Sequence, residues 1–135
     1  MSLILAAAAL AAASPAASDG VLGLWKTETR NGIVEISRCG ASVCGRLVTS
    51  DGLKADPNLK DVNNSNAALR GRPLKGLLIL SGFKPEGAVW NGGKIYNAED
   101  GKTYSARLTP AGNRLQVRGC IFVPLCKTQS WTRIR

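Results

Sequence analysis

Apolar and polar residues alternate along most of this chain, which is the pattern of half-buried β-strands. Residues 33–39 and 43–49 alternate in this way and flank the turn sequence Gly40-Ala41-Ser42, so they predict a β-hairpin. Six further segments are predicted as strands, and they cover residues 21–27, 74–83, 92–96, 102–109, 113–122 and 127–135. Glycine, proline and asparagine mark tight turns between them, for example at Pro85-Glu86-Gly87.

These segments predict an all-β fold, because no stretch of the chain shows a long helical period. Antiparallel strands joined by tight turns favour a closed up-and-down barrel of about eight strands, since closure leaves no sheet edge unpaired. A β-sandwich is the alternative. Residues 50–73 are a polar exception, and we expect this long loop to hold one short helical turn that begins near Asn64 or Ser65.

The first residues of the chain have a different character. Residues 3–13 are an unbroken apolar run, and residues 14–18 are small or proline. An apolar core of roughly 7–15 residues that ends in small residues is typical of a secretory signal peptide and is too short to span a bilayer. We predict a signal peptide over residues 1–18, cleaved after Ser18 or alternatively after Ala16, and one mature domain over residues 19–135. No later apolar stretch approaches the ~18 residues of a transmembrane helix.

The four cysteines fall into two pairs that are close in sequence, Cys39 with Cys44 and Cys120 with Cys126. Export to an oxidising compartment favours disulfides over a zinc site, whose cysteines are usually more closely spaced. Each local disulfide would close a loop of about six residues and contribute roughly 2 kcal/mol. Pairing of Cys39 with Cys120 or Cys126 stays open if the strands that carry them are neighbours.

The chain is strongly basic, with 18 Lys and Arg, 9 Asp and Glu and a net charge of +9. The basic residues are spread singly, without a run and without interleaved aromatic residues, so we expect no nucleic-acid partner. The alternative uses of this charge are attraction to an anionic surface of the cell envelope or to acidic glycans and, before these, simple solubility.

The absence of histidine from the chain narrows the possible chemistry. It removes Ser-His-Asp and Cys-His catalysis as well as histidine-based zinc and haem sites. Most of the nine acidic residues fall in predicted turns, so paired carboxylates facing one cleft are not expected either. We therefore expect no enzyme, no catalytic residue, no metal and no cofactor.

Eight short motifs along the mature chain together resemble a family of exported bacterial proteins catalogued as domain of unknown function 2147. The resemblance covers essentially the whole mature chain and implies a lipocalin-like (calycin) β-barrel in the periplasm or outside the cell. The motifs are Gly23-Leu24-Trp25, Cys44-Gly45-Arg46-Leu47-Val48, Asp61-Val62-Asn63-Asn64, Arg70-Gly71-Arg72-Pro73-Leu74-Lys75-Gly76-Leu77, Trp90-Asn91-Gly92-Gly93-Lys94-Ile95-Tyr96, Asp100-Gly101-Lys102-Thr103-Tyr104, Val117-Arg118-Gly119 and Thr128-Gln129-Ser130-Trp131-Thr132-Arg133.

A second resemblance concerns Trp25 and Arg133. Lipocalins begin with Gly-x-Trp on their first strand, and an arginine from their last strand packs across that indole. Gly23-Leu24-Trp25 and Arg133 look like the same arrangement. A guanidinium stacked on an indole can also donate hydrogen bonds to nearby carbonyls. We therefore predict a structural plug at the closed end of the barrel.

Two groups of residues are candidates for a binding site. The first would line the barrel interior as a calyx for a small apolar or amphipathic ligand, unless these side chains simply fill the barrel; it consists of Leu78, Leu80, Tyr104, Leu108 and Val117. The second lies in the polar loop, where the side chains could grip a polar ligand or Ca²⁺ but more readily form a buried hydrogen-bonded network; it consists of Asp61, Asn63, Asn64, Arg70 and Arg72.

The sequence therefore predicts a monomeric, exported, lipocalin-like barrel that binds a small apolar or amphipathic ligand or an envelope component. The alternative is an interaction module that acts on anionic envelope partners through its basic surface and holds no internal ligand.

Overall fold

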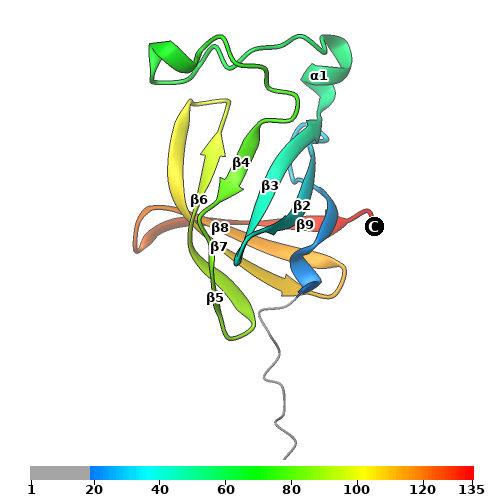
Figure 1. The fold of residues 1–135 in the computed structure, drawn as a ribbon, viewed down its shortest axis with the longest axis vertical. Helices are drawn as coiled ribbons and strands as arrows, with labels where there is room; N and C mark the ends of the chain where they lie inside the picture. The colour runs from blue at the N-terminus through cyan, green and yellow to red at the C-terminus, as the bar shows by residue number, and fades with distance from the viewer. Residues whose placement is uncertain (1–18) are drawn as a thin grey trace, which may run out of the picture.

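The computed structural model describes residues 19–135, and these residues form a closed antiparallel β-barrel (Figure 1). The predicted signal peptide lies outside the described residues. Strands pair in the order β4-β3-β2-β1-β9-β8-β7-β6-β5, and a further pairing of β4 with β6 closes a ring of eight strands. The strands are β1 (Gly23–Lys26), β2 (Ile33–Cys39), β3 (Ser42–Thr49), β4 (Leu78–Ser81), β5 (Lys84–Glu86), β6 (Val89–Asn97), β7 (Lys102–Ala111), β8 (Arg114–Phe122) and β9 (Leu125–Arg133). The predicted eight-stranded up-and-down barrel is confirmed, and the sandwich alternative is wrong.

The ninth strand, β5, was not predicted, because it begins just after the strand predicted over residues 74–83. Both β4 and β5 pair with β6, through Leu80 opposite Ile95 and through Lys84 opposite Asn91. Gly82, with φ of 78°, makes the bend between them. The prediction that Pro85 and Glu86 form a turn is wrong. Proline is accepted here because β5 pairs only with β6, so its other edge needs no backbone donor.

The barrel is filled by large side chains rather than by small ones. Trp25, Trp90 and Trp131 are all fully buried and lie in one apolar cluster. Glycines in the wall make room for this filling. A Cβ at Gly93 would lie 2.3 Å from the ring of Phe83, so the ring packs directly on the strand backbone.

Trp25 and Arg133 lie against each other where the first and last strands pair. The guanidinium carbon of Arg133 is 4.3 Å from the centre of the Trp25 ring. Its terminal nitrogens donate to the carbonyls of Leu22 and Gly20, beside the 3-10 helix η1 (Asp19–Val21). The indole nitrogen of Trp25 donates to Val21 O at 2.9 Å. Arg133 thus joins η1 and the residue after it to β9.

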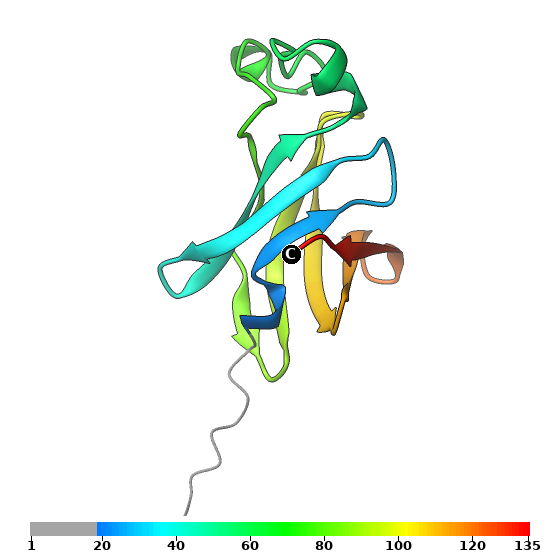
Figure 2. The same ribbon diagram turned by 90° about the vertical axis from the view of Figure 1, so that its right-hand side faces the viewer.

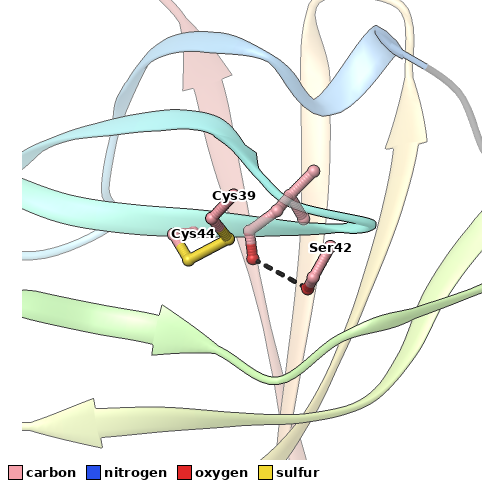
Figure 3. The surroundings of a disulfide bond; sticks show 4 residues. Cys39, Ser42 and Cys44 are labelled. Carbon is pink, nitrogen blue, oxygen red and sulfur yellow. Dashed lines mark hydrogen bonds between the residues drawn. A yellow bond between two sulfur atoms is a disulfide. The ribbon is translucent and has the colours of Figure 1, made fainter.

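Both disulfides join cysteines that are close in sequence, so the prediction of local pairing is confirmed. Figure 3 shows the Cys39–Cys44 bridge near the tip of the β2–β3 hairpin, where Ser42 Oγ donates to the Val43 carbonyl. Cys120 and Cys126 are directly opposite each other at the end of the β8–β9 hairpin.

The segment between β3 and β4 lies across one end of the barrel, opposite the end where β5 lies (Figures 1 and 2). It holds two short helices, α1 (Asp51–Ala55) and the 3-10 helix η2 (Ala67–Leu69). The predicted helical turn corresponds to η2, which begins slightly later than expected because Asn66 is its cap. Sequence analysis missed α1, although Ser50 caps it by accepting from Leu53 N at 3.2 Å.

Candidate functional site

A buried carboxylate organises the loop that crosses the barrel end. Asp61 is 1% exposed. One of its oxygens accepts hydrogen bonds from Asn64 Nδ2 at 2.9 Å and from Arg72 Nε at 2.8 Å, and the other accepts from the Tyr96 hydroxyl. The Arg72 guanidinium also lies over the Tyr96 ring, 5.1 Å from its centre. Because Tyr96 belongs to β6, this network fastens the loop to the barrel wall.

The electrostatics of this network favour an ionised Asp61. Burial alone would raise the pKa of Asp61, but the hydrogen bonds from Tyr96, Asn64 and Arg72 outweigh burial and lower the pKa below its ordinary value. Burial first, and then the hydrogen bond to Asp61, raise the pKa of the Tyr96 phenol. The pair therefore consists of a carboxylate that accepts and a neutral phenol that donates.

The loop is also fastened to the turn between β6 and β7. Asn63 Nδ2 donates to the carbonyls of Ala98 and Glu99, each at 3.3 Å. Gly101 has φ of 72°, and a Cβ there would come within 1.7 Å of the Asn63 carbonyl oxygen. Only glycine allows this close approach. The loop and the turn are thus held at a fixed separation.

Between the loop and the wall lies a cleft with a volume of about 420 Å³. Its lining combines apolar side chains, two cations and several hydroxyl or amide groups. The Arg72 hydrogen bonds formed within residues 19–135 engage only Nε, and Lys94 is exposed without a carboxylate partner in that range. The lining residues are Asn64, Ser65, Leu69, Arg72, Leu78, Ile79, Ser81, Lys94, Tyr96, Gly101 and Thr103.

The β6 part of the cleft lies on the outer face of the barrel wall. Ile95 packs against the apolar core, and its neighbours on β6 are Lys94 and Tyr96. Side chains alternate along a strand, so Lys94 and Tyr96 leave the face opposite the core. A ligand in this cleft would therefore lie under the loop and against the outer face of β6, with Leu78 and Ile79 of β4 beside it.

The calyx candidates separate in the structure. Leu80, Leu108 and Val117 are buried within the apolar cluster that contains the three tryptophans. Tyr104 is half-buried, and its hydroxyl donates to Asp100 in the preceding turn. Among the five, Leu78 lines the cleft.

The polar-loop candidates come together. Asp61, Asn64 and Arg72 form the network described above, and Arg70 Nε donates to Asn64 O at 2.8 Å. Asn63 makes the contacts to the turn between β6 and β7. Asn64 and Arg72 also line the cleft. The loop candidates thus build the rim of the cleft, while Asp61 holds that rim in place.

Apart from Leu78, sequence analysis did not assign the wall side of the cleft to a binding site, and it missed Lys94 and Ile79 altogether. A signal was present, because Lys94 and Tyr96 alternate with the core positions Gly93 and Ile95. This alternation fixes their face but not their closeness to a loop some 25 residues earlier, which depends on the pairing of β4 with β6.

Residues 19–135 contain no group of three or more His, Cys, Asp or Glu side chains that could hold a metal ion. In the same range, no helix is long and apolar enough to cross a membrane.

Comparison with known proteins agrees with the architecture. A family model described as "Uncharacterized protein conserved in bacteria (DUF2147)" matches residues 23–133. The chain belongs to this family. The residues that match the DUF2147 model include every strand of the barrel, and among them the two strands that hold Trp25 and Arg133. No curated protein matches the sequence.

A solved structure similar to this DUF2147 protein is described by the words "Protein HP1028 from the human pathogen Helicobacter pylori belongs to the lipocalin family". The two chains share 27% identity with a TM-score of 0.75, over 84% of this chain and 82% of the other. The barrel is therefore lipocalin-like, as the sequence resemblance implied.

Proposed function

We propose that this chain is an exported, non-enzymatic binding protein that holds one small amphipathic anion in the cleft beneath the loop. One observation carries the proposal: the cleft sets the cations of Arg72 and Lys94 beside the apolar side chains of Leu69, Leu78 and Ile79. A ligand with a negative head and a short apolar tail matches both kinds of surface. Clefts of about 300–1,000 Å³ are typical of small-molecule sites, and this one falls within that range.

The two ends of such a ligand have different partners. Arg72 donates to Asp61 through Nε, which leaves its terminal N–H groups to bind the anionic head of the ligand. The Lys94 ammonium can contact the same head from the barrel wall. Hydroxyl groups of Ser81 and Thr103 add donors around the head. The tail would lie along the leucines and the isoleucine.

Two further observations support export and binding. The disulfides Cys39–Cys44 and Cys120–Cys126 suit an oxidising compartment such as the bacterial periplasm. Lipocalins are barrels that hold one small ligand, and the similar H. pylori protein is described as a lipocalin. In this chain the tryptophans fill the middle of the barrel, which favours the cleft over the interior as the site.

Isothermal titration calorimetry with the disulfide-intact mature protein tests the proposal. Three probes separate its parts: decanoate has a charged head and a tail, decanol lacks the charge, and acetate lacks the tail. We expect decanoate to bind more tightly than either of the other two. Lys94→Gln should weaken decanoate binding about tenfold, and Lys84→Gln, on β5 outside the cleft, should leave it unchanged.

Ile79→Trp, which fills the apolar side of the cleft, should abolish decanoate binding. Because Ile79 also packs against the core, a urea unfolding curve establishes that this variant is folded. Equal binding of decanol and decanoate would contradict the anionic head. Binding that is insensitive to Lys94→Gln and Ile79→Trp would place the ligand elsewhere and contradict the proposal.

A further inference from the structure

The tip of the β8–β9 hairpin is a row of exposed apolar side chains. Ile121, Phe122, Val123 and Leu125 are 55 to 69% exposed, and they make up half of the exposed large apolar residues among residues 19–135. Figures 1 and 2 show this hairpin, coloured from orange to red, projecting from the side of the barrel. The Cys120–Cys126 disulfide joins its two strands directly below the tip.

Neighbouring exposed apolar side chains mark a surface that binds another protein or a membrane. This tip is convex, because it is the end of a projecting hairpin and not the floor of a groove. A convex apolar tip matches the acyl region of a lipid bilayer, which can close around it.

The positive charge of the chain is concentrated on the strands that carry this tip. Residues 102–135 contain seven Lys and Arg and no Asp or Glu, whereas residues 1–101 contain eleven basic and nine acidic residues. These seven account for +7 of the net charge of +9. They lie on β7, β8, β9 and the C-terminal end, and they are Lys102, Arg107, Arg114, Arg118, Lys127, Arg133 and Arg135.

Two of these arginines face each other without a counter-ion. Arg107 on β7 is directly opposite Arg118 on β8, an arrangement of like charges that destabilises a sheet. Neither forms a salt bridge with any carboxylate in residues 19–135, and Arg118 Nε is buried without a hydrogen-bond partner there. An oxyanion between the guanidinium groups would relieve both defects.

The surroundings of the pair are suited to a phosphate group. Arg107 and Arg118 border a groove of about 340 Å³ whose other lining includes the Thr109 and Thr128 hydroxyl groups and the Gln116 amide. Arginine binds phosphate through two parallel N–H donors, and the hydroxyl and amide groups add further donors. No acidic residue lines this groove.

The spacing between the tip and the arginine pair matches a bilayer surface. Arg118 and Phe122 are four residues apart on β8, which is about 13 Å along a strand. Interfacial elements enter a bilayer by about 5–10 Å, and the phosphate layer lies just outside the acyl boundary. If Phe122 lies at the acyl boundary, the flexible side chain of Arg118, about 13 Å further from the bilayer centre along the strand, reaches the lipid phosphates.

We propose that the β8–β9 hairpin docks on an anionic phospholipid membrane, with residues 121–125 entering the acyl boundary and Arg107 and Arg118 binding lipid phosphates. This inference does not depend on the proposed ligand, whose cleft is built by the loop, β4, β6, the β6–β7 turn and the start of β7. Docking would hold the barrel at the membrane surface through the tip of the β8–β9 hairpin, Arg107 and Arg118, none of which lines that cleft.

Vesicle co-sedimentation of the disulfide-intact mature protein tests this surface. We expect binding to vesicles of phosphatidylglycerol and phosphatidylethanolamine, much weaker binding to phosphatidylcholine vesicles, and a steep loss with added salt. The double substitution Phe122→Ser/Val123→Ser and the double substitution Arg107→Gln/Arg118→Gln should each weaken binding at least tenfold.

Matched controls come from elsewhere on the surface. Val62→Ser removes an equally exposed apolar side chain from the loop, and Lys54→Gln/Lys84→Gln removes two exposed charges from other elements. Both controls should change binding less than twofold. Circular dichroism and the urea midpoint establish that every variant is folded.

Phe122→Trp gives an independent readout, because a tryptophan at the tip should shift its emission to shorter wavelength when anionic vesicles are added. Absence of vesicle binding, or binding unaffected by both tip and arginine substitutions, would overturn the proposal. Binding of inorganic phosphate that depends on Arg107 and Arg118, without vesicle binding, would overturn it too and would identify a site for a soluble phosphate.

Discussion

Replacing Asp61 by asparagine tests how the loop is held to the barrel. The substitution keeps the size of the side chain and removes its charge. Two of the three hydrogen bonds to this group come from Arg72 and Tyr96, a cation and a strong neutral donor. A hydrogen bond to a charged group contributes roughly 1 kcal/mol more than a neutral one, so we expect Asp61→Asn to cost about 2 kcal/mol of unfolding free energy at pH 7.

The loss should depend on pH in a defined direction. Because the pKa of Asp61 is lowered in the folded protein, the unfolded chain binds this proton more readily. The stabilisation by the carboxylate is therefore fully present well above the ordinary pKa of 3.8 and is lost as the pH falls through the lowered, folded-state pKa. The free-energy difference between wild type and Asp61→Asn should be constant from pH 7 to about pH 5 and shrink below pH 4.

Urea unfolding without reductant, followed by circular dichroism at several pH values, measures this difference. Glu86→Gln is the control, because Glu86 is an exposed carboxylate that also accepts from one amide, Asn91 Nδ2. It should cost under about 0.5 kcal/mol. A cost for Asp61→Asn below that of the control, or a cost that stays the same down to pH 2.5, would refute the reasoning.

Two further substitutions test the barrel by the same urea assay. Gly93→Ala forces a Cβ against the Phe83 ring and should cost about 1–3 kcal/mol of unfolding free energy. The control is Gly71→Ala, whose Cβ meets no atom within 4 Å and which should change stability by less than about 0.5 kcal/mol. Equal effects of the two substitutions would contradict the packing account. Arg133→Ala removes the stack on Trp25 and two hydrogen bonds to carbonyls and should cost about 2–4 kcal/mol, with only partial recovery in Arg133→Lys. Full recovery with lysine would show that charge alone matters there.

The strands could be predicted from the sequence because their side chains alternate locally. The strand predicted over residues 33–39 has the same bounds as β2, and the disulfide pairs follow from short separations. The bend at Gly82 was not predictable, because it depends on β4 and β5 both pairing with β6. Pro85 reads as a turn residue until the partner strand is known.

The binding cleft was only half predictable. The loop side contributed Asn64 and Arg72, which belong to the long polar segment that interrupts the alternating strands. The wall side contributed Leu78 alone, because Lys94 resembles any exposed strand residue until the loop is placed over it. The exposed hairpin tip was also hidden, since Ile121 and Phe122 read as ordinary strand residues and their exposure depends on how far β8 and β9 project beyond the barrel.

The most direct test of ligand binding is native mass spectrometry of the mature protein purified gently from the cells that export it. The native mass is compared with the denatured mass of the same sample. Our account predicts an additional mass of a few hundred daltons that belongs to an anionic, amphipathic molecule and is absent from Ile79→Trp. A protein that is always empty, or an added mass that Ile79→Trp retains, would contradict it.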